Sequence, residues 1–382
     1  MRSSQAALQA LRADPCGARL LRAFAADDGV HLVGGAVRDL LLEREPRELD
    51  VVVEDDVDAA AARLGGEVTA HDRFGTALVR DGGCAFDLVR ARAESYAYPG
   101  ALPDVRQGTL DEDLRRRDVT INAIALGLDG TLTAVEGALD DLRGGVLRVL
   151  HDGSFVDDPT RVWRVARYAA RLGFAVEDRT RELAAAADPS TVSGDRLGAE
   201  LRLALREPDP PAALEAVRDL NAAYLPEGFE ARPAALPAAL ELLPGDGRAD
   251  LLTLAACTAG MDAVALLRWL DEMGFTGPER DLVAAASRFV TGAPLRAATP
   301  PAEIARAARG APVEVVALAG GDNARRWSDE LRHVRLDITG DDLLAAGVPE
   351  GPEVGERLRR VLDRKLDGEL GGREQQLAAA LE

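Results

Sequence analysis

The residues with the clearest chemical potential follow a short apolar run near the N-terminus. Gly34 and Gly35 close the run that begins at residue 30, and a helix-forming stretch with Arg38 in its first turn comes next. Glycines let the backbone approach a bulky anion closely, and the free N–H groups at a helix N-terminus attract negative charge. The pattern predicts a cradle for a phosphate group. A plain turn between a strand and a helix is the alternative.

Carboxylates occupy matching places in two further strand-like runs. Glu48 and Asp50 lie at alternate positions of the run 48–53, so they would point to the same face of a strand and could share a metal ion. Asp87 lies at the centre of the run 84–89, where an acid is costly to bury unless it is paired or metal-bound. A solvent-facing strand edge is the alternative for all three. A phosphate cradle beside metal-binding carboxylates suits phosphoryl or nucleotidyl transfer.

Five segments resemble, in order and spacing, the motifs of the bacterial class II CCA-adding tRNA nucleotidyltransferases. They are residues 34–39, 73–77, 92–96, 116–123 and 157–161. The resemblance is dense over 30–205 and thinner beyond it. The same family contains poly(A) polymerases and enzymes that add only CC or only A, so the resemblance indicates the chemistry more firmly than the product.

The resemblance implies roles for individual residues. Asp158 and Arg161 match the pair that selects C and then A by meeting the Watson–Crick edge of the base, and the arginines that follow match positions that contact the incoming nucleotide. The implied nucleotide-binding residues are Gly34, Gly35, Arg38, Arg117, Asp158, Arg161, Arg164 and Arg167. The implied catalytic carboxylates are Glu48, Asp50 and Asp87, the first two as ligands of Mg²⁺. The segment 92–96 resembles the loop that permits the switch from C to A addition, which favours a complete CCA-adding or an A-adding enzyme.

Two positions depart from the family pattern. Glu48 stands where an aspartate is usual; it is still an oxygen ligand but is one methylene longer, and Mg²⁺ is strict about geometry. Asp157 stands where a glutamate is usual, just outside the base-reading pair.

The spacing of residues 158–167 allows a reading independent of the family. If Asp158, Arg161, Arg164 and Arg167 are helical, steps of three spread them over one broad face. An exposed helix face with a weak Asp158–Arg161 surface pair is the alternative. The run of arginines at 115–117 is similarly open to a reading as a solvated patch.

Charge is distributed unevenly along the 382-residue chain. The net charge of −19 is unusual for a protein that binds RNA, because arginine and lysine neutralise phosphates in such complexes. Acid concentrates at 54–58 and 111–113, whereas base concentrates at 115–117 and along 161–171, and Lys365 is the single lysine. We expect a positive cleft on an acidic body and strongly salt-dependent RNA binding.

Cysteine content and hydropathy suggest an ordinary intracellular protein. Cys16, Cys84 and Cys257 are scattered, without metal-ligand spacing, so we expect neither a disulfide framework nor a zinc site. No apolar run reaches the roughly 18 residues of a membrane span, and no leader precedes the first helix. These features predict a soluble, cytoplasmic protein.

The order of elements predicts an α+β fold in which a mixed α/β head precedes an all-helical neck, body and tail. Strand-like runs lie at 30–34, 48–53, 76–80, 84–89 and 146–150, and residues 119–135 suit either a helix or a strand. Asp157 or Asp158 can cap a helix that has Pro159 near its start and runs to Leu172 and Gly173. The expected domains are a helical lead-in (1–28), the catalytic nucleotidyltransferase head (29–150), a neck with the nucleotide-selecting motif (151–207), a body (208–310) and a tRNA-binding tail (311–382).

The residues and the resemblance together predict a tRNA nucleotidyltransferase that restores CCA from CTP and ATP with Mg²⁺. An A-adding enzyme or a poly(A) polymerase is the first alternative, and an inactive RNA-binding paralogue is the second. The sequence gives no indication of the oligomeric state.

Overall fold

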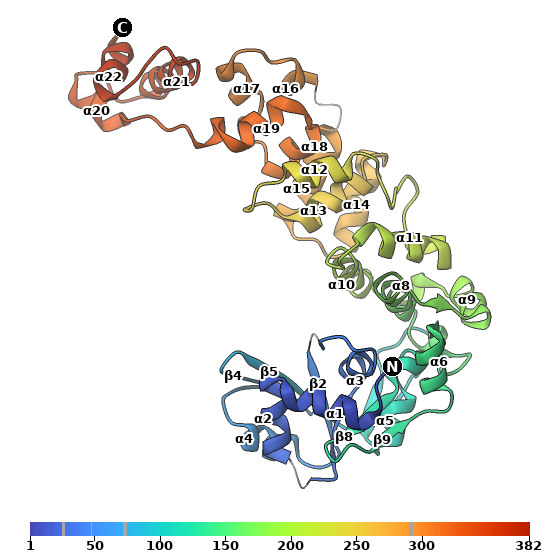
Figure 1. Cartoon of the computed structure of the whole chain (residues 1–382). Coiled ribbons are helices and arrows are strands. Elements are labelled where there is room, and N and C mark those ends of the chain that lie inside the picture. Colours follow the sequence, from blue (N-terminus) through green and yellow to red (C-terminus); the bar gives the residue numbers. More distant parts are fainter. Residues whose placement is uncertain (25–26, 47, 72–74, 290–292) are drawn as a thin grey trace. The chain divides into compact units, whose positions relative to one another are not determined.

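The computed structural model describes residues 1–24, 27–46, 48–71, 75–289 and 293–382 (Figure 1). The chain divides into two compact units, Met1–Leu225 and Pro226–Glu382. All strands of the described residues lie in the first unit, whereas the second is helical. This arrangement confirms the α+β class, with a mixed head followed by helices. The finer division into five domains stays a prediction.

Seven strands form one mixed sheet in the order β3-β4-β5-β2-β1-β8-β9. Neighbours run antiparallel except β2 and β5, which are parallel and place Asp50 directly opposite Asp87. Two smaller pairs, β6–β7 and β10–β11, lie outside this sheet. The strand bounds are β1 Val30–Val33, β2 Leu49–Val53, β3 Glu67–His71, β4 Thr76–Asp81, β5 Cys84–Arg90, β6 Arg92–Ser95, β7 Asp104–Gln107, β8 Ile124–Gly127, β9 Leu132–Ala134, β10 Val146–Leu147 and β11 Ala175–Val176.

Some helices of the first unit pack on the sheet, and others follow it in the chain. Helix α3 packs on β1 and β8, α4 packs on β4 and β5, and α1 and α2 pack against α3 and α4 respectively. The helix bounds are α1 Ser4–Ala13, α2 Pro15–Phe24, α3 Gly35–Leu41, α4 Val57–Leu64, α5 Leu110–Arg115, α6 Ala138–Gly144, α7 Ser154–Asp157, α8 Arg161–Leu172, α9 Asp178–Ala185, α10 Gly194–Ala204 and α11 Pro210–Leu220.

The observed strands correct the sequence-based expectations in two places. The runs at 30–34, 76–80 and 84–89 are strands as predicted, but β2 begins at Leu49, so Glu48 lies in a bend just before the strand. The ambiguous stretch 119–135 folds as a short 3₁₀ turn followed by β8 and β9. Strand β8 is buried at all four positions, which explains why it reads as a continuous apolar run without alternation.

The prediction of no disulfide is wrong. Cys16 on α2 and Cys84 at the start of β5 form a disulfide with a Cα–Cα distance of 5.4 Å. The two residues are 68 positions apart, and it is the packing of α2 against β5 that brings them together. Spacing along the chain carries no information about that contact. Cys257 is a buried free thiol.

Helix α8 begins two residues after Pro159, where its start is predicted. A short helix, α7, ends at Asp157, Asp158 is extended, and α8 begins at Arg161. Asp158 is held outside the helix because its Oδ1 accepts hydrogen bonds from the backbone N–H and the hydroxyl of Thr160. The predicted end is confirmed: α8 stops at Leu172, and Gly173 follows in the left-handed conformation.

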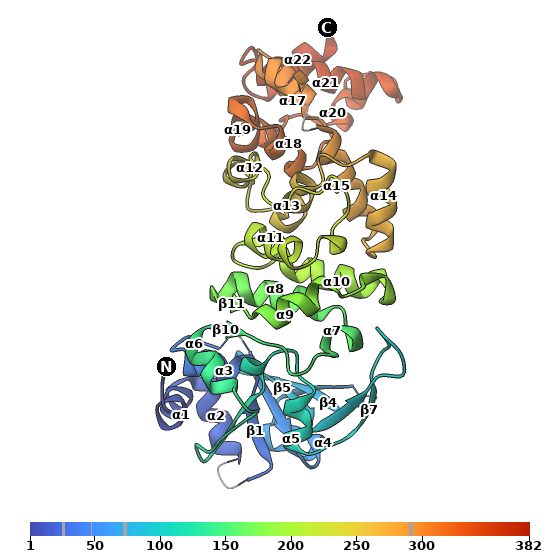
Figure 2. The same cartoon turned by 90° about the vertical axis from the view of Figure 1, so that its right-hand side faces the viewer.

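The second unit is helical, as predicted for the C-terminal part of the chain. Its helices, coloured yellow to red in Figure 2, pack through small apolar residues, with one core around Leu295 and Val316 and another around Leu343 and Val361. No helix among the described residues combines the length and the hydropathy that crossing a membrane requires. The helix bounds are α12 Leu236–Leu242, α13 Ala249–Cys257, α14 Ala263–Glu272, α15 Gly277–Phe289, α16 Ala293–Ala297, α17 Pro301–Ala307, α18 Val313–Ala319, α19 Gly321–Asp329, α20 Gly340–Ala345, α21 Pro352–Leu366 and α22 Arg373–Leu381.

Candidate active site

A cavity of about 830 Å³ opens within the Met1–Leu225 unit. Its walls come from the β1–α3 turn, the start of β2, strand β6, the segment 116–122 and helices α8 and α10. Ten of the eleven residues predicted from the sequence line it, and Asp87 is the exception. The fold therefore gathers residues from Gly34 to Arg167 around one space.

The cavity is rich in guanidinium groups although the protein is acidic. Among the described residues that line it, nine are arginines and seven are aspartates or glutamates. Guanidinium groups match the geometry of phosphates and of base edges. The cavity therefore has a local excess of positive charge, although the net charge of the whole chain is −19. Such a local excess favours the binding of an anionic ligand.

The carboxylate of Asp50 is influenced by two neighbouring acids, Glu48 and Asp87. The pKa of Asp50 is raised to about 6, mainly by burial and then by the negative charges of Asp87 and Glu48. The positive charges of Arg117 and Arg164 oppose this rise. In the described part of the chain, Glu48 and Asp50 form no ion pair with an arginine. A divalent cation would relieve this repulsion, and carboxylate oxygens are the ligands that Mg²⁺ prefers.

Two carboxylates, Glu48 and Asp50, are placed to bind a metal ion, rather than three. No cluster of three or more histidine, cysteine, aspartate or glutamate side chains within the described ranges is arranged to hold a metal. Glu48 and Asp50 line the cavity, whereas Asp87 lies on the neighbouring strand in register with Asp50. Ligands from a nucleotide phosphate and water would complete such a site.

The glycine turn brings Arg117 close to the backbone. Gly34 has a φ of +63°, and a Cβ at this position would lie 2.7 Å from Nη1 of Arg117. Arg38 is buried and folds back beside Gly35, with Nε donating to Asp39 at 2.8 Å and Nη1 donating to Asn122 at 2.7 Å. Only glycine satisfies both the backbone angle and the approach of the arginine at residue 34.

The arginine run at 115–117 is divided between the surface and the cavity. Arg115 is exposed and pairs with Asp111 at the surface. Arg116 and Arg117 both donate to the fully buried Asp113, at 2.6 and 2.9 Å, and both line the cavity. Burial alone would raise the pKa of Asp113, but the charges of the two arginines outweigh it and lower the pKa. The spacing of three and four residues could have revealed this pairing from the sequence.

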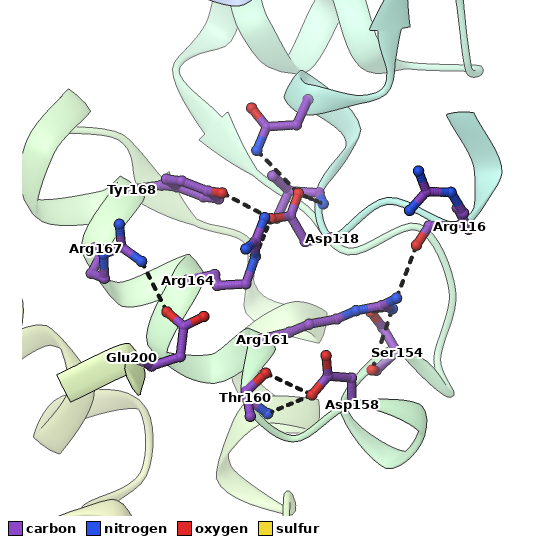
Figure 3. Close-up of polar contacts among 12 residues, drawn as sticks. Arg116, Asp118, Ser154, Asp158, Thr160, Arg161, Arg164, Arg167, Tyr168 and Glu200 are labelled. Atoms are coloured by element: carbon purple, nitrogen blue, oxygen red, sulfur yellow. Dashed lines mark hydrogen bonds and ion pairs between the residues drawn. The ribbon is translucent and has the colours of Figure 1, made fainter. Parts of the chain in front are cut away.

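The side chains of Asp158 and Arg161 are anchored separately rather than to each other, which contradicts the alternative of a weak surface pair between them. Oδ1 of Asp158 accepts from Thr160 and from Nη2 of Arg196, the latter at 2.9 Å. Nη1 of Arg161 donates to Oγ of Ser154 at 2.8 Å, and Nη2 donates to the carbonyl of Arg116 at 2.9 Å (Figure 3). Each side chain is thus fixed by its own neighbours.

The next two arginines of α8 are also held by carboxylates. Arg164 donates to Asp118 at 2.7 Å, and Arg167 donates to Glu200 at 2.9 Å (Figure 3). Arg167 also donates to Glu207 at 3.0 Å. Arg161, Arg164 and Arg167 all line the cavity, although Asp158 does not belong to the helix. Arg167 serves to join α8 to α10, a contact that its position in the sequence does not reveal.

The segment 92–96 forms a polar cluster at the cavity wall. Glu94 accepts from Arg92, Arg116 and Tyr96 at 3.0 Å each, and Nη2 of Arg161 donates to Oη of Tyr96 at 3.4 Å. Burial, reinforced by the charge of Glu94 against that of Arg161, raises the pKa of Tyr96 to about 12. In the motif at 73–77, Arg73 and Phe74 lie outside the described residues.

Several residues of the site were not singled out by the sequence analysis. Asp113 contacts Arg117 and Ser154 contacts Arg161, both from buried positions. Arg196 contacts Asp158 across a chain separation of 38 residues.

Comparison with known proteins identifies the family of this fold and cavity. Residues 30–148 match the family model described as the poly A polymerase head domain. The chain is 35% identical to the A-adding tRNA nucleotidyltransferase of Geobacter sulfurreducens over 92% of its own length and 45% of that protein, so it spans less than half of that relative. It is also 35% identical to the CC-adding tRNA nucleotidyltransferase of Deinococcus radiodurans, over 91% of this chain and 88% of that one.

Solved structures agree with the sequence relatives. An apo form of a CCA-adding enzyme superposes with a TM-score of 0.79 and 27% identity, covering 100% of this chain and 98% of the other. A complex of CCA-adding enzyme with CTP superposes with a TM-score of 0.75 and 26% identity, again covering 100% and 98%. The chain belongs to the tRNA nucleotidyltransferase family, which includes the CCA-adding and A-adding enzymes.

Proposed function

We propose that the protein restores the CCA end of tRNA from CTP and ATP by metal-dependent nucleotidyl transfer. The observation that carries the proposal is that one cavity is lined both by Glu48 and Asp50 and by the anchored pair Asp158 and Arg161. The first pair suits a metal ion, and the second suits a base edge. A site that both activates a phosphate and reads a base needs these two sets within one nucleotide length.

In this proposal the arginines hold the nucleotide and orient its base. Arg117 and Arg38 neutralise the triphosphate at the glycine turn. The second carboxylate oxygen of Asp158 accepts from an amino group of the base, and Arg161 donates to its ring nitrogen or carbonyl. A wrong base leaves these groups unpaired, which makes discrimination steep. Arg164 and Arg167 border the same cavity and complete its positive wall.

The reaction joins the 3′-hydroxyl oxygen of tRNA to the α-phosphorus and breaks the bond to the β-phosphate. The new phosphodiester stays on the tRNA, and pyrophosphate leaves. Glu48 and Asp50 would hold Mg²⁺, which when bound would supply charge stabilisation for the triphosphate and would lower the pKa of the attacking hydroxyl. Asp87, in register with Asp50, reinforces the negative potential that attracts the cation. No covalent enzyme intermediate is required.

We assign the remaining domains on the same basis. Residues 29–150 and 151–207 supply the cavity, and residues 311–382 form the tail that binds the body of the tRNA. A tRNA substrate is met in the cytoplasm, which is where the enzyme would act.

The relatives also favour a second candidate, an enzyme that adds only part of the CCA end. The Geobacter relative is named for A addition and the Deinococcus relative for CC addition, at equal identity to this chain. The polar cluster of Glu94 and Tyr96 lies in the segment that resembles the C-to-A switching loop, which favours an enzyme that adds A. An inactive RNA-binding paralogue is the third possibility, because Glu48 replaces the usual aspartate.

Incorporation assays on three tRNAs, lacking three, two or one terminal nucleotides, test the proposal. Each tRNA is incubated with CTP alone, ATP alone or both, and the products are resolved to single nucleotides. Complete CCA addition requires incorporation of C on the first two substrates and of A on the third. Extension of the third substrate alone indicates an A-adding enzyme, extended oligo(A) products indicate a poly(A) polymerase, and the absence of pyrophosphate release in every reaction indicates the inactive paralogue.

A further inference from the structure

The disulfide between Cys16 and Cys84 is a feature of the first unit for which the nucleotide cavity gives no account. It joins α2 to the first residue of β5, across 68 positions of the chain. Neither cysteine lines the cavity. The third cysteine, Cys257, is a buried free thiol in the other compact unit. The bond therefore acts on the packing of the Met1–Leu225 unit and has no direct contact with a nucleotide.

The bond lies where a reducing agent can reach it. Cys16 and Cys84 are only half-buried. Cys84 follows the β4–β5 turn, in which Gly82 and Gly83 are exposed. Apart from the adjoining residues, no atom of the described chain lies within 4 Å of a Cβ built on either glycine. The turn therefore leaves open space through which a thiolate can approach the sulfur of Cys84.

Helix α2 has other contacts that keep it in place when the disulfide opens. Arg19 donates through Nη2 to the carbonyl of Leu64 at 2.6 Å and forms an ion pair with Asp81 of β4. The same helix buries the apolar side chains of Leu20 and Phe24. These contacts maintain the fold of the reduced protein, although the partly exposed ion pair contributes little stability.

The position of β5 beside the cavity does not depend on the disulfide. Residues 86–90 of β5 pair in parallel with residues 49–53 of β2, and residues 84–89 pair antiparallel with residues 76–81 of β4. Because β5 is hydrogen-bonded along both edges, Asp87 stays opposite Asp50 when the bond opens. Reduction should therefore change the stability of the protein and leave its chemistry intact.

We propose that the Cys16–Cys84 disulfide is a redox-sensitive clamp that sets the thermal stability of the Met1–Leu225 unit and opens by exchange with a dithiol. One thiolate of the dithiol attacks the sulfur of Cys84, and the sulfur of Cys16 leaves. The second thiolate then attacks the first sulfur of the dithiol, which closes into a disulfide and releases Cys84. The dithiol gives up two electrons and two protons, and the protein gains two thiols. The clamp is independent of which nucleotides the enzyme adds.

The clamp stabilises the protein by restricting the unfolded chain. A cross-link between residues 68 positions apart removes conformational entropy that the chain would otherwise gain on unfolding. Opening the bond restores this entropy to the unfolded state. The reduced protein should therefore melt at least about 5 °C below the oxidised protein.

The test compares the full chain oxidised with glutathione disulfide and the same chain reduced with dithiothreitol. Alkylation after unfolding, read by mass, should find one free thiol in the oxidised sample and three in the reduced sample. Thermal unfolding should show the lower melting temperature in the reduced sample. Cys16→Ser should melt at the same temperature with and without dithiothreitol. Cys257→Ser is the matched control and should keep the shift of the wild type, because Cys257 lies outside the bond.

Two results would overturn the inference. Three free thiols in the oxidised sample would show that the bond does not form, and equal melting temperatures of the oxidised and reduced protein would show that it does not act as a clamp. The reduced wild type carries no substitution, so this comparison stands even where Cys16→Ser does not fold.

An activity assay separates the clamp from a role in catalysis. Well below both melting temperatures, the oxidised and reduced proteins should incorporate nucleotides at equal rates, whereas near the lower melting temperature the reduced protein should lose activity faster. A lower rate of the reduced protein at the low temperature would contradict the independence of β5 from the disulfide. The thiol count and the melting temperatures need no substrate, so they test the clamp even where the proposed function fails.

Discussion

The buried carboxylate of Asp118 accepts hydrogen bonds from residues on two sides of the cavity. Its Oδ1 accepts from Asn122, which in turn accepts from Arg38, and its Oδ2 accepts from Arg164 and Tyr168. Burial alone would raise the pKa of Asp118, but the charge of Arg164 and the hydrogen bonds from its neighbours hold it well below the usual range. The ionised carboxylate thus stabilises the folded protein.

We predict a pH-dependent loss of stability in Asp118→Asn. Because the pKa is lower in the folded than in the unfolded protein, the carboxylate stabilises the fold fully above about pH 4, and this stabilisation declines as the pH falls further. The variant should lose about 3 kcal/mol at neutral pH, the scale for breaking a buried ion pair. Urea unfolding at pH 7, 5 and 3 measures the difference from the wild type. A difference that does not narrow at pH 3 would contradict the assignment.

At the residue scale, sequence reasoning finds groups that are chemically unusual at their positions. The types and motifs of Gly34, Asp50 and Arg161 suit nucleotide chemistry, and all three line the cavity. The residues that hold the base-reading side chains, such as Ser154 for Arg161 and Arg196 for Asp158, are ordinary types whose partners lie elsewhere in the fold. Their contacts depend on tertiary packing, so they could not be predicted from local pattern.

The β1–α3 turn is the element that places Arg117 against the backbone. Its conformation at Gly34, with φ +63° and ψ −131°, is one that residues with a Cβ rarely adopt. Any other residue at position 34 would strain the backbone, and its Cβ would collide with Arg117. The turn therefore requires glycine.

We predict that Gly34→Ala reduces both stability and nucleotide binding. The backbone strain should cost about 1–3 kcal/mol, and displacement of Arg117 should raise the KM for the nucleotide. Gly137→Ala is the matched control: its φ is +77°, but nothing lies within 4 Å of the added Cβ, so it carries strain without a collision. Thermal unfolding and KM are compared for both variants. An equal KM in the two variants would show that Arg117 is not displaced.

Helices and strands were predictable where the pattern of apolar residues was long or where a distinctive residue marked the end of the element. The end of α8 at Leu172 follows from Gly173, and strands β4 and β5 follow from the strand-like runs 76–80 and 84–89. The short strands β6 and β7 carry charged residues and gain their form only by pairing with each other. Asp158 is extended and its side chain accepts from the Thr160 N–H, which agrees with the predicted capping role of an aspartate at 157 or 158.

At the scale of the whole molecule, the charge distribution is the feature that most affects binding. The chain carries 65 acidic and 46 basic residues, yet the cavity contains more arginines than acids among the described residues. The local surplus attracts phosphates, whereas the acidic remainder repels RNA from other surfaces.

We predict that tRNA binding is strongly dependent on salt. Each neutralised phosphate releases counterions, so the dissociation constant should rise at least about tenfold between about 50 and 200 mM salt. Fluorescence anisotropy of a labelled tRNA at several salt concentrations measures the slope. A dissociation constant that does not change with salt would contradict recognition through arginine–phosphate contacts.

The most direct test of the central claim compares the wild type with Asp50→Asn in single-nucleotide incorporation on a tRNA end that the wild type extends. The substitution keeps the shape of the side chain and removes the negative charge that we propose binds the metal. Incorporation in the presence of Mg²⁺ should fall by about 100-fold or more, with the affinity for tRNA nearly unchanged. Turnover equal to that of the wild type would show that Asp50 does not hold a catalytic metal.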